Sequence, residues 1–344
     1  MSDPEFEPLE HLLARQGLAG VPEEPFPNDG WSGASLTLLR RGAERYVLKR
    51  DSLAQDWIAR ATADGPTLRE AWFAARGPAL PSPIRAPYLG AGREGEGFGM
   101  LMPDLTGVLF DWDAPISVEA LDRLLSGLAT MHATPPRELL ASGREHWCPL
   151  GERVALICRP SLERPGPARD AVGDRILPGW DAFDRVASAP ARELIASLGK
   201  EPAPLLAALA RLPGTLIHGD LKLANVGIEA DGTIELVDWQ MVAVAPIAVE
   251  LGWFLVSNVA SLPLPPGDVL AKYHAALVGQ RRGRDVAGEW DAQVDAAVLT
   301  GVLLRGWRKG ADSAAGVIHA SGVSAEDDLA WWCDRAVAAA DRLL

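Results

Sequence analysis

An aspartate, a lysine and an asparagine stand close together in the segment HGDLKLANVG. Asp220 is followed by Lys222 two positions later and by Asn225 five positions later, and Asp238 comes thirteen residues after Asn225. The residues between Asn225 and Asp238 alternate in polarity around an Asp-Gly pair, which is typical of a β-hairpin. A hairpin brings its two ends together, so we expect Asn225 and Asp238 to face one point.

This set of side chains fits the chemistry of phosphoryl transfer. Amide and carboxylate oxygens are ligands that Mg²⁺ accepts together with substrate phosphates and water, so we predict that Asn225 and Asp238 bind Mg²⁺. Asp220 lies outside that pair and is expected to accept or orient the proton of an attacking hydroxyl. Lys222 is expected to reach the transferred phosphate. Either the Asp or the Asn alone more often caps a turn, but their joint spacing favours the chemical interpretation.

The pattern H-G-D-x-x-x-x-N, followed by a strand that ends in V-D-W, resembles the aminoglycoside phosphotransferase and choline kinase-like family. That family shares the protein-kinase-like fold. The resemblance implies an α+β, bilobal protein with a small N-terminal antiparallel sheet lobe and a larger, mainly helical lobe that carries the catalytic hairpin. It extends over about residues 30–260 and is most specific at 218–240.

The resemblance also implies a phosphate clamp in the first lobe. In that family a strand lysine pairs with the nucleotide phosphates and with a glutamate of the next major helix, and Lys49 and Glu70 take these places. Thr67 and Glu70 also fit a capping box, in which Glu70 would bond backbone N–H groups. The downstream motif favours the ion pair. The preceding segment DGWSGAS offers backbone N–H groups and the Ser32 hydroxyl to the phosphates.

The adenine of ATP is expected between the lobes, where FGMLMPDL crosses from one to the other. Met102 and Leu105 would contact the base there. Because Pro103 has no N–H, its carbonyl and the Leu105 N–H are the expected hydrogen-bonding pair. We therefore divide the chain into a nucleotide-clamping lobe over residues 1–104 and a catalytic and acceptor-binding helical lobe over residues 105–344.

Three other polar residues are expected to support the site without performing chemistry. His132 ends a predicted helix, and His218 precedes the proposed base. Glu250 stands where the resembling family commonly has an aspartate that opens a helix. We expect His132 to be structural and His218 to brace the catalytic loop. Glu250 either takes the same bracing role or marks a local geometry that differs from that of the family.

Hydrophobic patterning supports the two-lobe division. The first part of the chain predicts strands and two helices, in this order: a hairpin over 35–49, helices over 51–63 and 67–76, and two strands before residue 105. The second part has helical spacing over 117–133, over 191–211 and from 247 onward, interrupted by the catalytic hairpin. The segment 135–190 contains many prolines and is expected to be irregular.

The amino-acid composition limits the classes of binding partner that we expect. The chain of 344 residues has 33 Lys plus Arg against 46 Asp plus Glu, a net charge of −13, which argues against a broad nucleic-acid surface. It contains no apolar run of about 18 residues and no signal-peptide pattern, so we expect a cytoplasmic protein without membrane contact. The three cysteines form no CxxC pair. We expect a monomer or a homodimer.

These observations predict an ATP- and Mg²⁺-dependent O-phosphotransferase that acts on a hydroxyl of a small molecule. The acceptor stays open between an amine held by Trp and Asp side chains, a neutral sugar, a hydroxy amino acid and another metabolite hydroxyl. A protein serine/threonine kinase is one alternative, although no APE-like segment follows VDWQ. A non-catalytic nucleotide-binding protein is the other, although all the catalytic polar residues are present.

Overall fold

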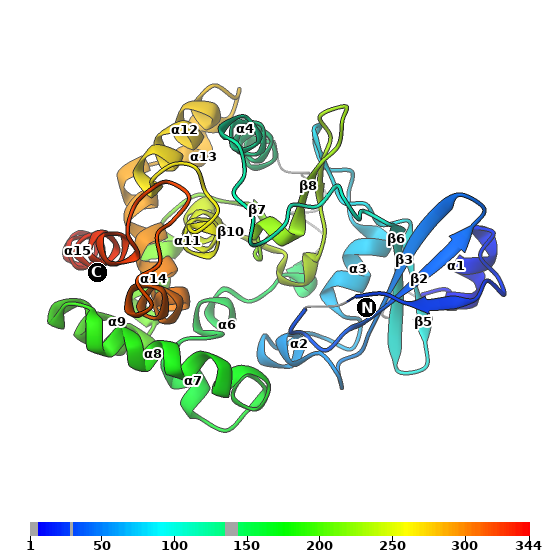
Figure 1. The fold of residues 1–344 in the computed structure, drawn as a ribbon, viewed down its shortest axis with the longest axis horizontal. Helices are drawn as coiled ribbons and strands as arrows, with labels where there is room; N and C mark the ends of the chain where they lie inside the picture. The colour runs from blue at the N-terminus through cyan, green and yellow to red at the C-terminus, as the bar shows by residue number, and fades with distance from the viewer. Residues whose placement is uncertain (1–5, 28–29, 135–143) are drawn as a thin grey trace.

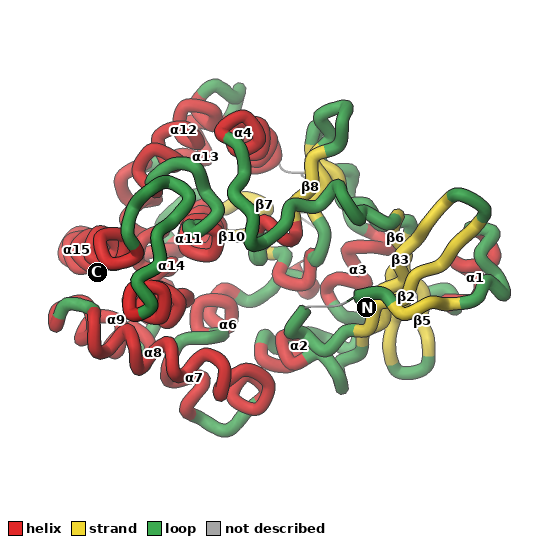
Figure 2. The backbone as a smooth tube through the Cα atoms, in the orientation of Figure 1, coloured by secondary structure: helices red, strands yellow, loops and turns green. Residues whose placement is uncertain are grey.

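The computed structural model describes residues 6–27, 30–134 and 144–344. Figure 1 shows a β-rich N-terminal part beside a larger helical part, and Figure 2 shows most strands gathered in the former. The α+β architecture with two lobes is therefore confirmed. The lobe boundary at residues 104 and 105 stays a prediction.

The N-terminal lobe is built on a five-stranded antiparallel sheet with the order β1-β2-β3-β6-β5. Its strands are β1 (Glu23–Pro25), β2 (Ser35–Arg41), β3 (Glu44–Asp51), β5 (Gly90–Glu94) and β6 (Gly97–Pro103). The predicted hairpin is β2–β3. The edge strand β1 was not predicted, because its Glu-Glu-Pro sequence has the composition of a loop and gains strand geometry only by pairing with β2.

Three helices accompany this sheet, namely α1 (Leu9–Arg15), α2 (Trp57–Ala61) and α3 (Arg69–Arg76). The prediction of a helix over 51–63 is wrong at its start. Asp51 is the last residue of β3, paired with Phe98, and the Asp56 carboxylate caps α2 by accepting the N–H groups of Ile58 and Ala59. The sheet and the cap together delay the helix by six residues.

The C-terminal lobe consists mainly of eleven helices in the part of the chain that is described. They are α4 (Val118–Ala133), α6 (Leu150–Ala155), α7 (Arg159–Glu163), α8 (Asp174–Val186), α9 (Ala189–Lys200), α10 (Ala203–Ala210), α11 (Ile247–Asn258), α12 (Pro266–Val278), α13 (Gly283–Ala287), α14 (Trp290–Ala314) and α15 (Ala325–Leu343). None of the helices in the described ranges has the length and apolar character needed to cross a bilayer.

The prediction that 135–190 is irregular is wrong for most of the segment from residue 150 onward, while residues 135–143 lie outside the described ranges. Helices α6 to α8 fill this segment, with a π-helical turn at Arg169–Gly173 before α8. Pro149 and Pro160 sit at helix starts, where a missing N–H costs little, whereas Pro178 lies inside α8. The first two helices span only one or two turns, too short for a hydrophobic period to emerge.

Short strands in the C-terminal lobe position the catalytic segment. The predicted hairpin is present as β8 (Val226–Ile228) and β9 (Ile234–Leu236), and β4 (Ile84–Arg85) extends it in parallel beside β9. A second pair joins β7 (Gly214–Ile217) to β10 (Ala243–Pro246). The strands β4 and β10 were not predicted, because two to four residues carry too little pattern.

Helix α3 is attached to the C-terminal lobe by buried contacts. The Arg69 guanidinium donates to the Gln240 carbonyl at 2.9 Å, and the Phe73 ring stacks on Trp239 with centroids 4.3 Å apart. Trp239 is fully buried and follows Asp238 directly. The helix that carries Glu70 is thus fixed against the residues that follow the predicted metal ligand.

Candidate active site

The catalytic loop begins where β7 ends. Gly219 has a φ of +83°, and a Cβ there would lie 2.0 Å from the Met241 carbonyl oxygen, so a larger residue would force the loop apart. The His218 Nε2 atom lies 2.9 Å from the Val237 carbonyl, and its Nδ1 accepts the Asp220 N–H at 3.2 Å. Both ring nitrogens of His218 are therefore engaged with backbone groups, as its predicted bracing role requires.

Glu250 holds the same loop from the other side. Its carboxylate accepts the N–H groups of His218 at 2.6 Å and Gly219 at 3.0 Å. It also lies 3.6 Å from the Nε2 atom of His132, whose Nδ1 contacts the Tyr273 hydroxyl at 2.6 Å. Burial favours the neutral acid, but His132 and the backbone N–H groups keep the pKa of Glu250 below its usual value. Glu250 therefore braces the loop as an anion.

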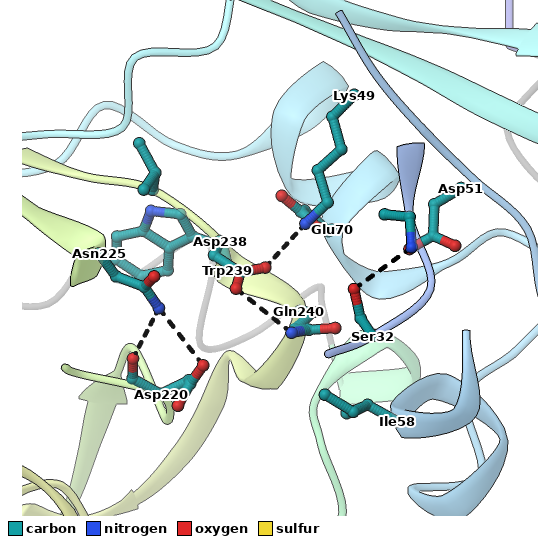
Figure 3. A network of polar contacts seen from close by, with 12 residues as sticks. Ser32, Lys49, Asp51, Ile58, Glu70, Asp220, Asn225, Asp238, Trp239 and Gln240 are labelled. Carbon is teal, nitrogen blue, oxygen red and sulfur yellow. Dashed lines mark hydrogen bonds and ion pairs between the residues drawn. The ribbon is translucent and has the colours of Figure 1, made fainter. Parts of the chain in front are cut away.

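Asp220 is buried, with 7% of its surface exposed, and it is surrounded by donors. The Lys222 ammonium lies 3.1 Å from its carboxylate. The Asn225 side-chain nitrogen donates to the Asp220 carbonyl at 2.9 Å and to its carboxylate at 3.3 Å (Figure 3). Burial opposes the charge of Lys222, but Asp220 and Asp238 outweigh it and raise the pKa of Lys222. Three of the predicted residues therefore meet at one place.

Asp238 joins this place from the far end of the hairpin. The Val237 N–H donates to the Asn225 carbonyl at 3.0 Å, so the two hairpin ends are adjacent. Asp238 has a left-handed backbone with a φ of +68°, a conformation that is uncommon for a non-glycine residue and often found at functional sites. Burial opposes its ionisation, but Lys49 and Lys222 lower the pKa of Asp238 to about 2. The carboxylate is therefore charged at neutral pH.

The donors fit Mg²⁺, although the binding itself stays a prediction. Asp238 supplies an ionised carboxylate. Because the Asn225 nitrogen points at Asp220, its side-chain oxygen is left without a hydrogen bond among the described residues. An anionic oxygen and a neutral amide oxygen, completed by phosphates and water, form a ligand set that this ion accepts.

Lys49 connects the two lobes. Its ammonium lies 2.6 Å from the Glu70 carboxylate and 2.8 Å from that of Asp238 (Figure 3). The ion pair predicted from the sequence is therefore present. The capping box is not, because α3 has its N-cap at Leu68, without a side-chain bond. Burial and the neighbouring Asp238 carboxylate raise the pKa of Glu70, against the lowering effect of Lys49, whose single ammonium is shared between the two carboxylates. The role of Lys49 and Glu70 towards phosphates stays a prediction.

Tyr88 belongs to this network and was missed in the sequence. Its hydroxyl donates to Glu70 at 2.6 Å and accepts the N–H of Asp238 at 3.1 Å. It therefore links the helix that carries Glu70 to the predicted metal ligand. The segment around Tyr88 reads as the start of a strand, and no spacing relates it to residues 150 positions away.

The glycine- and serine-containing loop lies against the start of α2. Gly33 has a φ of +106°, and a Cβ there would meet the Gln55 carbonyl oxygen at 2.7 Å. The Ser32 carbonyl accepts the Trp57 N–H at 3.2 Å, and its hydroxyl lies 3.5 Å from the Ala34 nitrogen. These contacts hold the loop against the start of α2. That Ser32 contacts phosphates stays a prediction.

The crossing between the lobes follows β6. Met102 lies in that strand beside Val47 and is buried. The Leu105 carbonyl accepts the N–H groups of Val108 and Leu109, while the Leu105 N–H donates to no acceptor among the described residues. A free N–H at this point is what an adenine contact would use. The roles of Met102 and Leu105 stay predictions.

Arg153, on α6, is a second residue that the sequence did not reveal. It donates two hydrogen bonds to the Gly219 carbonyl, at 2.9 and 2.7 Å, and lies over the Trp253 ring at 4.3 Å. Arg153 is almost fully buried. It therefore positions the residue that precedes Asp220, from a segment that was expected to be irregular.

An amine held by Trp and Asp side chains is one of the open acceptors, and α8 carries three acids beside Trp180. Asp181 and Asp184 both pair with Arg159, at 2.8 and 2.7 Å, and Asp174 pairs with Arg169 at 2.7 Å. Trp180 is buried and donates to a backbone carbonyl. In this structure these side chains serve arginine pairs and the helical core.

Comparisons with known proteins agree with the geometry. Residues 25–290 match the APH family, described as the phosphotransferase enzyme family. No curated protein sequence gave a match. Among solved structures, the macrolide 2'-phosphotransferase MphH of Brachybacterium faecium is 19% identical, with 96% of this chain and 97% of that one covered and a TM-score of 0.41.

Two further solved structures are similar along almost the whole chain. The choline kinase LicA of Streptococcus pneumoniae is 12% identical, with 96% of this chain and 99% of that one covered and a TM-score of 0.47. The ethanolamine kinase of Plasmodium vivax is 8% identical, with 97% and 87% covered and a TM-score of 0.49.

Proposed function

This chain belongs to the phosphotransferase enzyme family, and from that premise we propose that it transfers the γ-phosphoryl group of ATP to a hydroxyl of a small molecule, with Mg²⁺ as cofactor. It is a small-molecule kinase. The observation that carries the finer proposal is the convergence of two groups of polar side chains. The first group is Asp220, Lys222 and Asn225, and the second is Asp238, Lys49 and Glu70.

In the proposed reaction the acceptor oxygen forms a bond to the γ-phosphorus, and the bond from that phosphorus to the β–γ bridging oxygen breaks, so ADP leaves. Asp220 orients the hydroxyl and takes its proton. Lys222, which lies beside Asp220, neutralises charge on the phosphoryl group as it moves. Lys49 holds the nucleotide phosphates, and Glu70 with Tyr88 fixes the position of its ammonium.

Asn225 and Asp238 would hold Mg²⁺, which when bound neutralises the triphosphate and aligns it for transfer. Bound nucleotide and metal would compete with Lys49 for the Asp238 carboxylate, which in this structure bonds that lysine. Glu70 stays paired with Lys49 in either case, so the ammonium keeps its place when the contact to Asp238 changes.

The test is the variant Asp220→Ala, measured as ADP release in the presence of Mg²⁺, ATP and an accepted hydroxyl compound. We expect kcat to fall by about 10²- to 10⁴-fold, the range for losing a positioned acid–base group, with ATP binding retained. Isothermal titration with ATP measures the second quantity. Wild-type turnover by Asp220→Ala would refute the assignment of the base.

A further inference from the structure

Arg305 lies in the C-terminal lobe without a counter-ion. It belongs to α14, and only 8% of its surface is exposed. Its Nε atom is buried without a hydrogen-bond partner. Among the described residues, no carboxylate forms an ion pair with Arg305. The nearest acid along the helix, Asp312, is already paired with Arg308 at 2.9 Å.

A buried, unpaired guanidinium is costly, because the charge loses its hydration and gains no compensating partner. Burial lowers the pKa of Arg305 to about 10, which still leaves it charged at neutral pH. A chain that keeps such a group has a use for its charge. The group that would compensate it is therefore to be sought in a ligand.

Two indole rings hold the Arg305 guanidinium in place. It lies 5.1 Å from the ring centroid of Trp253, on α11, and 4.9 Å from that of Trp307. Contacts of this kind fix the guanidinium without using its N–H groups. The N–H groups of the guanidinium therefore remain for a planar, bidentate acceptor such as a carboxylate.

The position of Arg305 relates it to the proposed base. Trp253, which Arg305 contacts, also lies under Arg153, and Arg153 bonds the carbonyl of Gly219, the residue before Asp220. Burial and the neighbouring Arg308 lower the pKa of Arg305, and the negative charge of Asp220 raises it. Arg305 is thus one indole ring away from the support of the catalytic loop.

We propose that Arg305 binds an anionic group of the acceptor, and that the acceptor is a hydroxylated carboxylate. This inference rests on the proposed function, because it assigns a substrate class to the same site. The carboxylate would form a bidentate pair with the Arg305 edge while Asp220 receives the hydroxyl. An aminated acceptor without a carboxylate would instead bring its cation towards Arg305 and be repelled.

The experiment compares matched acceptors that differ only in the anionic group. Serine and serinamide, homoserine and homoserinamide, and glycerate and glyceramide form the pairs, and choline and kanamycin represent cationic acceptors. Each is tested with Mg²⁺ and ATP by ADP release, and each carboxylate is tested for binding by thermal shift. The proteins are wild type, Arg305→Gln, Arg305→Lys and Asp220→Ala, with Arg281→Gln, an exposed arginine of the same lobe, as a control.

We expect at least one carboxylate to be phosphorylated with a higher kcat/KM than its amide. Arg305→Gln should raise KM for that carboxylate by about 10- to 100-fold, the cost of losing charge-assisted hydrogen bonds, and leave KM for ATP unchanged. Arg305→Lys should recover part of the loss. Arg281→Gln, at an exposed position, should behave as wild type.

The inference is overturned if amides or cationic acceptors are used as well as the carboxylates. An unchanged KM in Arg305→Gln overturns it too, and so does a panel in which no carboxylate is phosphorylated or raises the melting temperature. In these cases, turnover that still depends on Asp220 leaves the proposed function standing. Turnover that survives in Asp220→Ala refutes the proposed function itself.

Discussion

Buried charge is balanced in opposite ways on the two sides of the catalytic loop. On the side of the N-terminal lobe, the single ammonium of Lys49 serves two carboxylates, Glu70 and Asp238. On the side of α11 and α14, the buried guanidinium groups of Arg153 and Arg305 form no ion pair within the described chain. One side has a surplus of acid and the other a surplus of base.

The difference indicates what each side is built to receive. A buried charge without a partner is unfavourable, so a surplus of one sign is completed by a ligand of the other. The acidic side suits a divalent cation that arrives with a nucleotide. The basic side suits an anionic acceptor. If the proposed ligands bind, the metal–nucleotide complex and the carboxylate would occupy opposite sides of one loop and would not displace each other.

The largest effect is expected when the cation is removed from the acidic side. Lys49→Met leaves Glu70 and Asp238 buried without their partner, and we expect the free energy of unfolding to fall by about 3–5 kcal/mol. Urea denaturation at pH 7 measures it. A loss below about 1 kcal/mol would show that these carboxylates do not depend on Lys49. Leu36→Met, the strand neighbour opposite Lys49, serves as the control for a change in the sheet.

A second prediction concerns pH on the same side. Asp51 follows Lys49 on β3 and is buried, and burial with the nearby Asp56 and Glu70 raises its pKa to about 8, against the lowering effect of Lys49. The folded state therefore holds a proton that the unfolded state has already released above about pH 4. Stability should fall as pH rises towards 8, by up to about 1.4 kcal/mol per pH unit.

The variant Asp51→Asn isolates this effect, because it keeps the shape of the side chain and cannot titrate. Urea denaturation of both proteins at pH 6, 7 and 8 should show a steeper decline for the wild type. Parallel curves for the two proteins would mean that Asp51 is already ionised in the folded state, and that the acidic side tolerates more negative charge than we infer.

The smallest effect is expected on the basic side. Arg305→Met removes a charge that has no protein partner, so the free energy of unfolding should stay the same or rise by up to about 1 kcal/mol. The same change at the exposed Arg281 should alter the free energy of unfolding by no more than about 0.5 kcal/mol. Strong destabilisation by Arg305→Met would mean that Arg305 is a structural residue, and the contrast between the two sides would disappear.

The sequence was most informative where function and local structure coincide. The spacing of Asp220, Asn225 and Asp238 predicts both a hairpin and a convergence of oxygens, because a tight turn between two short strands brings the ends of the hairpin close together. The pair of Lys49 and Glu70 was predicted from the resemblance to the aminoglycoside phosphotransferase and choline kinase-like family, because a strand lysine and a helix glutamate take the places that they have in that family. The hairpin spacing, by contrast, is a property that a window of 10–20 residues contains.

What could not be predicted depends on contacts between distant segments. Tyr88 reaches Asp238 across 150 positions, and Arg305 reaches the support of the catalytic loop through an indole ring. In the sequence, Arg305 is one of several cations on a long helix. That no carboxylate forms an ion pair with it can be seen only in the folded structure, where the acids lie elsewhere. The short helices between residues 150 and 163 were not predicted for a different reason, because each has too few residues to show a hydrophobic period.

The attachment of α3 has a mechanical consequence. Ala71 of this helix packs with Phe98 and Met100 in the core of the sheet, while Arg69 and Phe73 fasten the same helix to the residues after Asp238, so Glu70 is held by both lobes. A tilt of the sheet that separated the lobes would have to break the buried contacts of α3 on one of its two sides. The helix therefore couples any movement of the sheet to the position of the carboxylate that holds Lys49.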